Sequence, residues 1–278
     1  MKHPIAGAAC FLLAVAASVA AAPVTESRVW TEKYPVDVLA PRLAISNIWG
    51  NVRVRPGSSG EITVTVDELR SAPDRELFER SLETLKLNVQ ADNNGVSILV
   101  GGATRRFEQR NLCRECRVDY QFEVLVPAGT QLDVGTVMDG SIDVAGVIGV
   151  ISASNVNGPI SVSEVRDCQT LESVNGKVEV SFTLAPGQDC DIETINGDIT
   201  LELPGGSGLD VALNLFNGRV VSEFAVDSFA LPATVEHSSD GDGHRYRIQQ
   251  SAGLRLEGGG PMFSISSLNG DIRIQKTQ

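Results

Sequence analysis

One short pattern recurs along the second half of the chain: a bulky apolar residue, then Asn-Gly, then an alternating apolar stretch. Weaker copies centre on Gly140, where Asp139 replaces Asn, and on Gly50 near the beginning. From Gly140 to Gly197, the glycines of successive copies lie 18, 18 and 21 residues apart. A recurring short period predicts repeated structural units. The full copies are Asn157-Gly158, Asn175-Gly176, Asn196-Gly197, Asn217-Gly218 and Asn269-Gly270.

The alternation on both sides of each Asn-Gly predicts two short strands joined by a turn. Asn-Gly also favours tight hairpins, so a twisted antiparallel meander or sandwich is an alternative. Isolated hairpins need partners, whereas tandem units of 18–21 residues can stack and bury one another's apolar faces. We therefore predict an all-β chain in which residues 131–278 form a β-solenoid, resembling a parallel β-helix, with an insert at about 221–262.

Stacking makes demands on the turn itself. The Asn side chains are expected to form a ladder, and each Gly is expected to take a positive φ that other residues resist. The last copy, at 263–274, is separated from the others by about fifty residues. Terminal repeats often differ from the rest and close the end of a stack, so this copy is expected to be the cap.

The first 130 residues do not show this regular repeat. Residues 1–20 are predicted to be a signal peptide, because a polar start precedes an apolar run and a small-x-small cleavage site, Ser18-Val19-Ala20. Cys10 within that run raises a lipoprotein as an alternative. We expect a leader or linker at 21–41 and an N-terminal β region at 42–130. One helix is predicted at about 74–85, from an Asp74 start and helically spaced apolar residues.

Four cysteines follow the predicted signal peptide, and an even number in an exported chain predicts disulfides, with three connectivities possible. Cys168 and Cys190 lie seven and six residues before the Asn of their repeats, nearly equivalent places in successive units. Stacking would bring them to the distance of neighbouring strands. We predict a Cys168–Cys190 bond, and a Cys113–Cys116 bond that closes a small local loop.

The formal net charge of −12 argues against nucleic acid or an anionic membrane surface as a partner. One basic concentration stands out, and it is either an ordinary charged loop or a contact for an anionic partner. Its members are Arg105, Arg106, Arg110, Arg114 and Arg117.

Signals for catalysis are weak. Stacked carboxylates would suit a carbohydrate-active β-helix enzyme, a polysaccharide lyase or hydrolase, which is the alternative function. The residue after each turn glycine is instead acidic in some copies and basic or uncharged in others. The Asp240–Gly243 turn lacks the ligand spacing of a calcium or zinc site. We expect no catalytic, cofactor or metal residues. The residues that follow the turn glycines are Ser141, Pro159, Lys177, Asp198, Arg219 and Asp271.

The signal sequence, the early copy at 48–54, the single helix and the serial Asn-Gly units together resemble the putative-adhesin, β-strand-repeat family of unknown function found in bacterial envelope proteins. The resemblance covers about residues 40–276 and implies a structural or binding role without catalytic residues. The expected protein is therefore an exported, non-catalytic, adhesin-like module. It would be periplasmic or at the cell surface, with an envelope component (protein or glycan) as partner and no integral membrane segment after signal cleavage.

Overall fold

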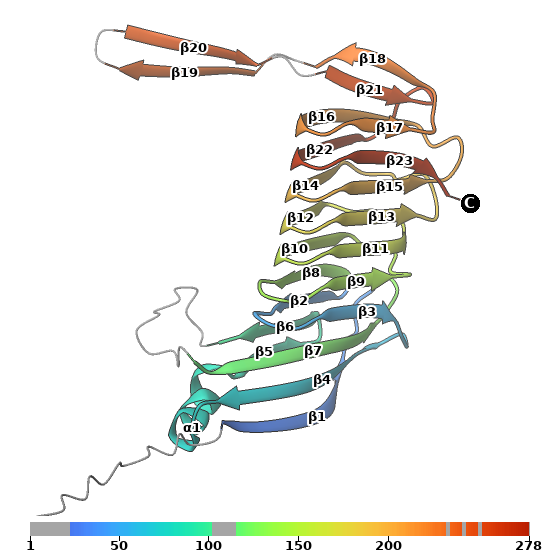
Figure 1. The fold of residues 1–278 in the computed structure, drawn as a ribbon. Coiled ribbons are helices and arrows are strands. Elements are labelled where there is room, and N and C mark those ends of the chain that lie inside the picture. Colours follow the sequence, from blue (N-terminus) through green and yellow to red (C-terminus); the bar gives the residue numbers. More distant parts are fainter. Residues whose placement is uncertain (1–22, 102–114, 232–233, 241–242, 250–251, 278) are drawn as a thin grey trace, which may run out of the picture.

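The computed structural model describes residues 23–101, 115–231, 234–240, 243–249 and 252–277. The predicted signal peptide at 1–20 lies outside these residues. The described chain is all-β with one helix, and two large, mostly parallel sheets lie face to face along an elongated body (Figure 1). We call the ten-stranded sheet A and the eleven-stranded sheet B. Within the described chain, no helix is long and apolar enough to cross a membrane.

Each Asn-Gly copy contributes one strand to each sheet, and we call the two strands with their corner a rung. In spatial order, the sheet B strands are β8 (Gln131–Thr136), β10 (Ile151–Asn157), β12 (Thr170–Asn175), β14 (Cys190–Asn196), β22 (Met262–Asn269) and β16 (Leu209–Asn217). Their sheet A counterparts are β9 (Ile142–Ala145), β11 (Ile160–Val165), β13 (Val178–Phe182), β15 (Ile199–Leu203), β23 (Ile272–Lys276) and β17 (Val220–Ser222). Neighbouring strands within each set are parallel, and the corner asparagines pair with one another in register.

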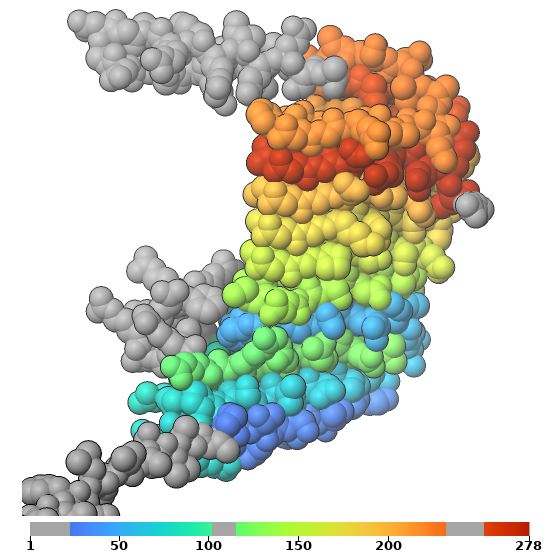
Figure 2. Space-filling model, viewed as in Figure 1, coloured from blue at the N-terminus to red at the C-terminus, as the bar shows by residue number. Residues whose placement is uncertain are grey.

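The last copy is not the cap that the sequence predicted. Its rung, β22–β23, lies between β14–β15 and β16–β17, and it is the red band between gold and orange in Figure 2. Its inward residues, including Phe263, Ile265 and Ile272, are completely buried. In the rung β16–β17, which lies nearer the end of the stack, the inward residues Leu213 and Val220 are only partly buried. The last copy therefore lies inside the stack, with a neighbouring rung on each side.

The insert closes that end instead. Strand β21 (Ala252–Leu256) pairs antiparallel with both β16 and β18 (Val226–Ala230), so sheet B ends in two antiparallel strands. In the sequence between β18 and β21, β19 (Thr234–Asp240) and β20 (Gly243–Gln249) form a separate two-stranded hairpin. A change from parallel to antiparallel pairing stops the repeat from propagating.

At the other end, the weak copy around Gly50 also forms a rung. Strand β2 (Arg42–Ser46) pairs parallel with β8, and β3 (Val52–Pro56) pairs parallel with β9. Strand pairing therefore continues across the expected boundary at residue 130. Beyond this rung, sheet A continues through β7 (Arg117–Val126), β4 (Glu61–Ala72) and β1 (Val24–Pro35), and sheet B continues through β6 (Gly95–Val100) and β5 (Leu87–Asp92).

The predicted helix is present as α1 (Arg75–Thr84). Asp74 caps its N-terminus, because its carboxylate accepts a hydrogen bond from the Leu77 amide at 2.8 Å. Buried Arg70 donates hydrogen bonds to the carbonyl oxygens of Ser81 and Leu85 and to the hydroxyl of Tyr120. These bonds tie the end of α1 to the sheet.

The expectation of a leader or linker at 21–41 is wrong for residues 24–35. They form β1, which pairs antiparallel with β4 along its whole length. Most β1 side chains are exposed, and only Val24, Trp30 and Tyr34 are half-buried. An edge strand held mainly by backbone hydrogen bonds leaves little apolar periodicity in the sequence.

The predicted positive φ is present at Gly218 and Gly270, at 151° and 158°, but the other three corner glycines are required for a different reason. Gly158, Gly176 and Gly197 do not have positive φ angles. A Cβ atom at Gly197 would overlap the carbonyl oxygen of Gly176, and one at Gly176 would overlap that of Gly158. Backbone of the next rung therefore occupies the space where a side chain would begin, and only glycine fits.

We expect Gly197→Ala to lower the free energy of unfolding by about 1–3 kcal/mol, because the added methyl group forces two backbones apart. Gly205→Ala is the matched control, since nothing lies within 4 Å of a Cβ there and its φ is not positive. The control should stay within about 0.5 kcal/mol of the parent in urea unfolding. Equal stability of the two variants would contradict the close approach at the corner.

Candidate functional site

The Asn-Gly corners bring the five predicted turn asparagines into one line. Each side-chain amide nitrogen donates to the side-chain oxygen of the next asparagine at 2.9 Å, from Asn175 to Asn157, Asn196 to Asn175, Asn269 to Asn196 and Asn217 to Asn269. At the end of this line, Asn157 donates to the carbonyl of Val137 at 3.2 Å. The asparagine ladder runs along the edge where the two sheets meet, and it holds the corner straight.

A second polar column lies inside the corner, two residues before four of the five ladder asparagines and at the register-equivalent Thr136; before Asn217 the position is Leu215. Its side chains are at most 3% exposed, and they donate to corner glycine carbonyls of the neighbouring rung. Ser173 donates to Gly158 at 3.1 Å, and Thr194 donates to Gly176 at 3.0 Å. Sequence reasoning missed this column, because a Ser or Thr among alternating apolar residues resembles an outward position. The column comprises Thr136, Asn155, Ser173, Thr194 and Ser267.

The residue just before each asparagine points outward, and here the structure presents an unexpected surface. The five side chains at this position and the register-equivalent Val137 are apolar and between 36% and 78% exposed, and we call these six the apolar stripe. Parallel strands lie about 4.8 Å apart, so the stripe crosses six rungs over roughly 24 Å. In spatial order it comprises Val137, Val156, Val174, Ile195, Leu268 and Phe216.

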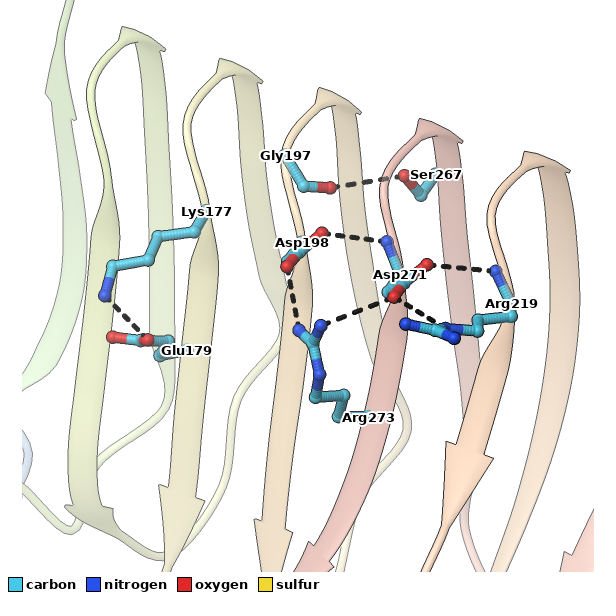
Figure 3. Close-up of polar contacts among 8 residues, drawn as sticks. All are labelled: Lys177, Glu179, Gly197, Asp198, Arg219, Ser267, Asp271 and Arg273. Carbon is cyan, nitrogen blue, oxygen red and sulfur yellow. Dashed lines mark hydrogen bonds and ion pairs between the residues drawn. The ribbon is translucent and has the colours of Figure 1, made fainter.

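On the sheet A side of the corner, the residues after Gly197, Gly218 and Gly270 contribute to a network of ion pairs (Figure 3). Asp198 accepts from Arg273 at 2.8 Å and from the Asp271 amide at 2.9 Å. Asp271 pairs in turn with Arg219 at 3.0 Å. The guanidinium of Arg273 is the main cause that lowers the pKa of Asp198. Two neighbouring acids in this column are therefore neutralised by two arginines, and the column carries no stack of unpaired carboxylates.

Cys168 and Cys190 form a disulfide with a Cα–Cα distance of 5.5 Å, and it joins the starts of the neighbouring strands β12 and β14. The sequence predicted this pair from the repeat register. Cys116 is buried, with its sulfur 3.3 Å from the carbonyl oxygen of Leu77. Cys113 lies outside the described residues, so the Cys113–Cys116 bond stays a prediction.

Of the predicted basic contact, only Arg117 lies within the described residues, at the start of β7. It makes two hydrogen bonds of 2.9 Å to Asp119 and an ion pair of 3.5 Å to Asp139. Two carboxylates thus already neutralise Arg117. The other members, Arg105, Arg106, Arg110 and Arg114, lie outside the described residues.

Two adjacent hollows of about 540 and 730 Å³ lie where the sheet B strands begin, away from the apolar stripe. Their carboxylates include Asp133 and Asp191, which are three strand spacings apart, with Ser152 and Thr170 between them in register. That is roughly 14 Å, beyond the 5–9.5 Å typical of paired glycosidase carboxyl groups. Within the described chain, no cluster of three or more His, Cys, Asp or Glu residues could hold a metal ion.

No protein-family model matches the chain, and no curated protein matches it. Among solved structures, it is similar to a "putative cell adhesion protein" from Clostridium sporogenes, at 10% identity over 92% of this chain and 100% of that chain, with a TM-score of 0.46. It is also similar to a "putative adhesin" from Bacteroides fragilis, at 10% identity over 90% and 97% of the two chains, with a TM-score of 0.34. Likenesses this distant assign neither a family nor a function.

The inner polar column can be tested by removing one hydroxyl without changing side-chain shape. Thr194→Val should lower the free energy of unfolding by about 1–2 kcal/mol, because the buried Gly176 carbonyl loses its side-chain donor. Thr200→Val on β15 is the control, since Thr200 is only partly buried and faces away from the core. Denaturant unfolding measures both variants, and a cost for Thr194→Val no larger than the control's would refute the role of this column.

Proposed function

We propose that this chain is a β-solenoid that acts as a non-catalytic, adhesin-like binding module of the cell envelope, with the apolar stripe as its binding face. The observation that carries the proposal is the exposure of six apolar side chains in one file beside the asparagine ladder. Contiguous exposed apolar surface on a folded protein marks an interaction site. Scattered surface residues would not recur at the same position of six rungs.

The stripe suits binding energetically because its backbone is already ordered. Each of its side chains stands beside two continuous sheets and a hydrogen-bonded ladder, so little chain entropy is lost when a partner covers it. Full burial of a Val, Leu, Ile or Phe side chain contributes about 1.5–3 kcal/mol. A partner that covers only part of the stripe can therefore bind without any deep pocket.

An extracytoplasmic place is part of the proposal. The Cys168–Cys190 disulfide supports it, since such bonds persist in oxidising compartments. The predicted signal peptide points the same way. We favour the periplasm, with the cell surface as the other place, and an envelope protein or glycan as partner.

The carbohydrate-active enzyme remains the competing function. It would need two carboxylates within one groove. Asp133 and Asp191 are too far apart for that role, and of the pair Asp189 and Asp191, which line one hollow together, Asp189 already accepts a hydrogen bond from the Met262 amide at 2.8 Å. Glu172 and Glu193 do lie opposite each other on β12 and β14, but they are exposed and line neither of the two hollows. The repeated apolar file is therefore the stronger observation, and it favours binding.

A variant with Val174→Thr, Ile195→Thr and Leu268→Thr tests the proposed face. It keeps partly exposed strand positions but replaces apolar groups with hydroxyls, so stability should change little while recovery of the bound envelope component falls at least about tenfold. Recovery is measured by crosslinking in the native envelope, purification of the chain and quantitative mass spectrometry.

The matched control is Glu172→Gln with Glu193→Gln, which alters the next outward column of the same strands. It should recover the same component as the parent protein. Undiminished recovery by the stripe variant, or equal loss in the control, would rule out the stripe as the binding face.

A further inference from the structure

At the N-terminal end of the stack, beside α1, sheet A ends in β7, β4 and β1 and sheet B ends in β6 and β5 (Figure 1). A cleft of about 310 Å³ lies there, lined by residues of β1, β4, β5, β6 and β7 and of the end of α1. It is at the opposite end of the molecule from β16–β17 and is formed by different residues from the apolar stripe. The proposed binding face therefore leaves this cleft unexplained.

The interior of the cleft is apolar and aromatic. Val64, Val66 and Ile98 line it and are each 2% exposed, while Trp30 and Leu87 pack half-buried against the core. Three of the five Trp and Tyr residues in the chain line this one cleft, although aromatic residues make up only 5% of the sequence. Concave, aromatic-lined spaces with a few polar groups are typical of small-molecule sites. These three are Trp30, Tyr34 and Tyr120.

The carboxylates of the lining already have partners within the protein. Glu68 pairs with buried Arg70 at 2.6 Å. Glu32 accepts a hydrogen bond from the hydroxyl of Tyr34. Burial and then Glu32 raise the pKa of Tyr34, so this hydroxyl stays protonated and continues to donate. Arg70 neutralises Glu68, whereas Glu32 keeps its negative charge, because a hydrogen bond from a neutral hydroxyl does not remove it.

The basic groups at the mouth are less engaged. The Arg28 guanidinium stacks on the Trp30 ring at 4.9 Å, and within the described part of the chain it forms no ion pair. Lys86 has only a long, exposed contact of 3.3 Å with Glu83. The lining carries three cations, Arg28, Arg70 and Lys86, against two acids, Glu32 and Glu68, so it has a net charge of +1 in a chain whose net charge is −12.

We propose that the cleft binds a small anionic amphiphile, with its hydrocarbon part against Trp30, Val64 and Leu87 and its anionic head beside Arg28 and Lys86. The volume is at the lower limit of ligand pockets, which span about 300–1,000 Å³, so a single short chain fits better than a whole membrane lipid. The site is independent of the proposed binding face.

Titration of the purified chain with sodium decanoate below its micelle concentration tests this site. In a Trp49→Phe background, Trp30 is the only tryptophan, and its fluorescence should change saturably with one decanoate per chain. Arg28→Gln should weaken decanoate binding about tenfold and leave binding of uncharged decanol unchanged. Arg80→Gln, an exposed cation on α1 outside the cleft, is the control and should bind decanoate like the parent.

A second variant, Val89→Phe, fills the mouth from a position that is 39% exposed and keeps Trp30 as the only tryptophan, so it should abolish binding while the thermal unfolding curve is retained. Unsaturable binding, an affinity for decyltrimethylammonium as high as that for decanoate, or equal weakening by Arg28→Gln and Arg80→Gln would each overturn the proposal.

Discussion

The close approach of one glycine corner to the next is the constraint on which the structure depends. At Gly176 and Gly197 the backbone of the neighbouring rung occupies the place of a side chain. Two rungs can therefore stack only when their glycines lie directly over each other. The asparagine beside each glycine reinforces this alignment, because its amide reaches the next asparagine at 2.9 Å only in the same register.

Once the corners are aligned, every position of the repeat becomes a column along the body. The inward apolar positions form a continuous core, and the small polar position two residues before Asn satisfies the corner carbonyls. The position before Asn becomes the apolar stripe, and the position after Gly becomes a column in which Asp198 and Asp271 lie against arginines. A surface with repeated chemistry is thus a direct consequence of the corner, and this is what makes binding the function best supported by the fold.

Parts of this arrangement could be predicted from the sequence. The Asn-Gly period indicated parallel stacking, Asp74 marked the start of the helix, and the repeat register paired Cys168 with Cys190. The position of the last rung could not be predicted, since the full copies share the same Asn-Gly corner, which does not specify the neighbour. The edge strand β1 and the cleft beside it were also missed, because residues that line a space between distant strands share no local period.

Disulfide trapping across the stripe tests the central claim most directly, which is that identical corners stack in register in the order found here. Ile195 and Leu268 lie in neighbouring rungs, whereas Ile195 and Phe216 are separated by the inserted rung, although Phe216 is much nearer in the sequence. With neighbouring strands about 4.8 Å apart and a disulfide reaching about 7 Å between Cα atoms, only the first pair is within reach. The account predicts that Ile195→Cys with Leu268→Cys crosslinks under mild oxidation and that Ile195→Cys with Phe216→Cys does not. Efficient crosslinking of the second pair, with none of the first, would contradict it.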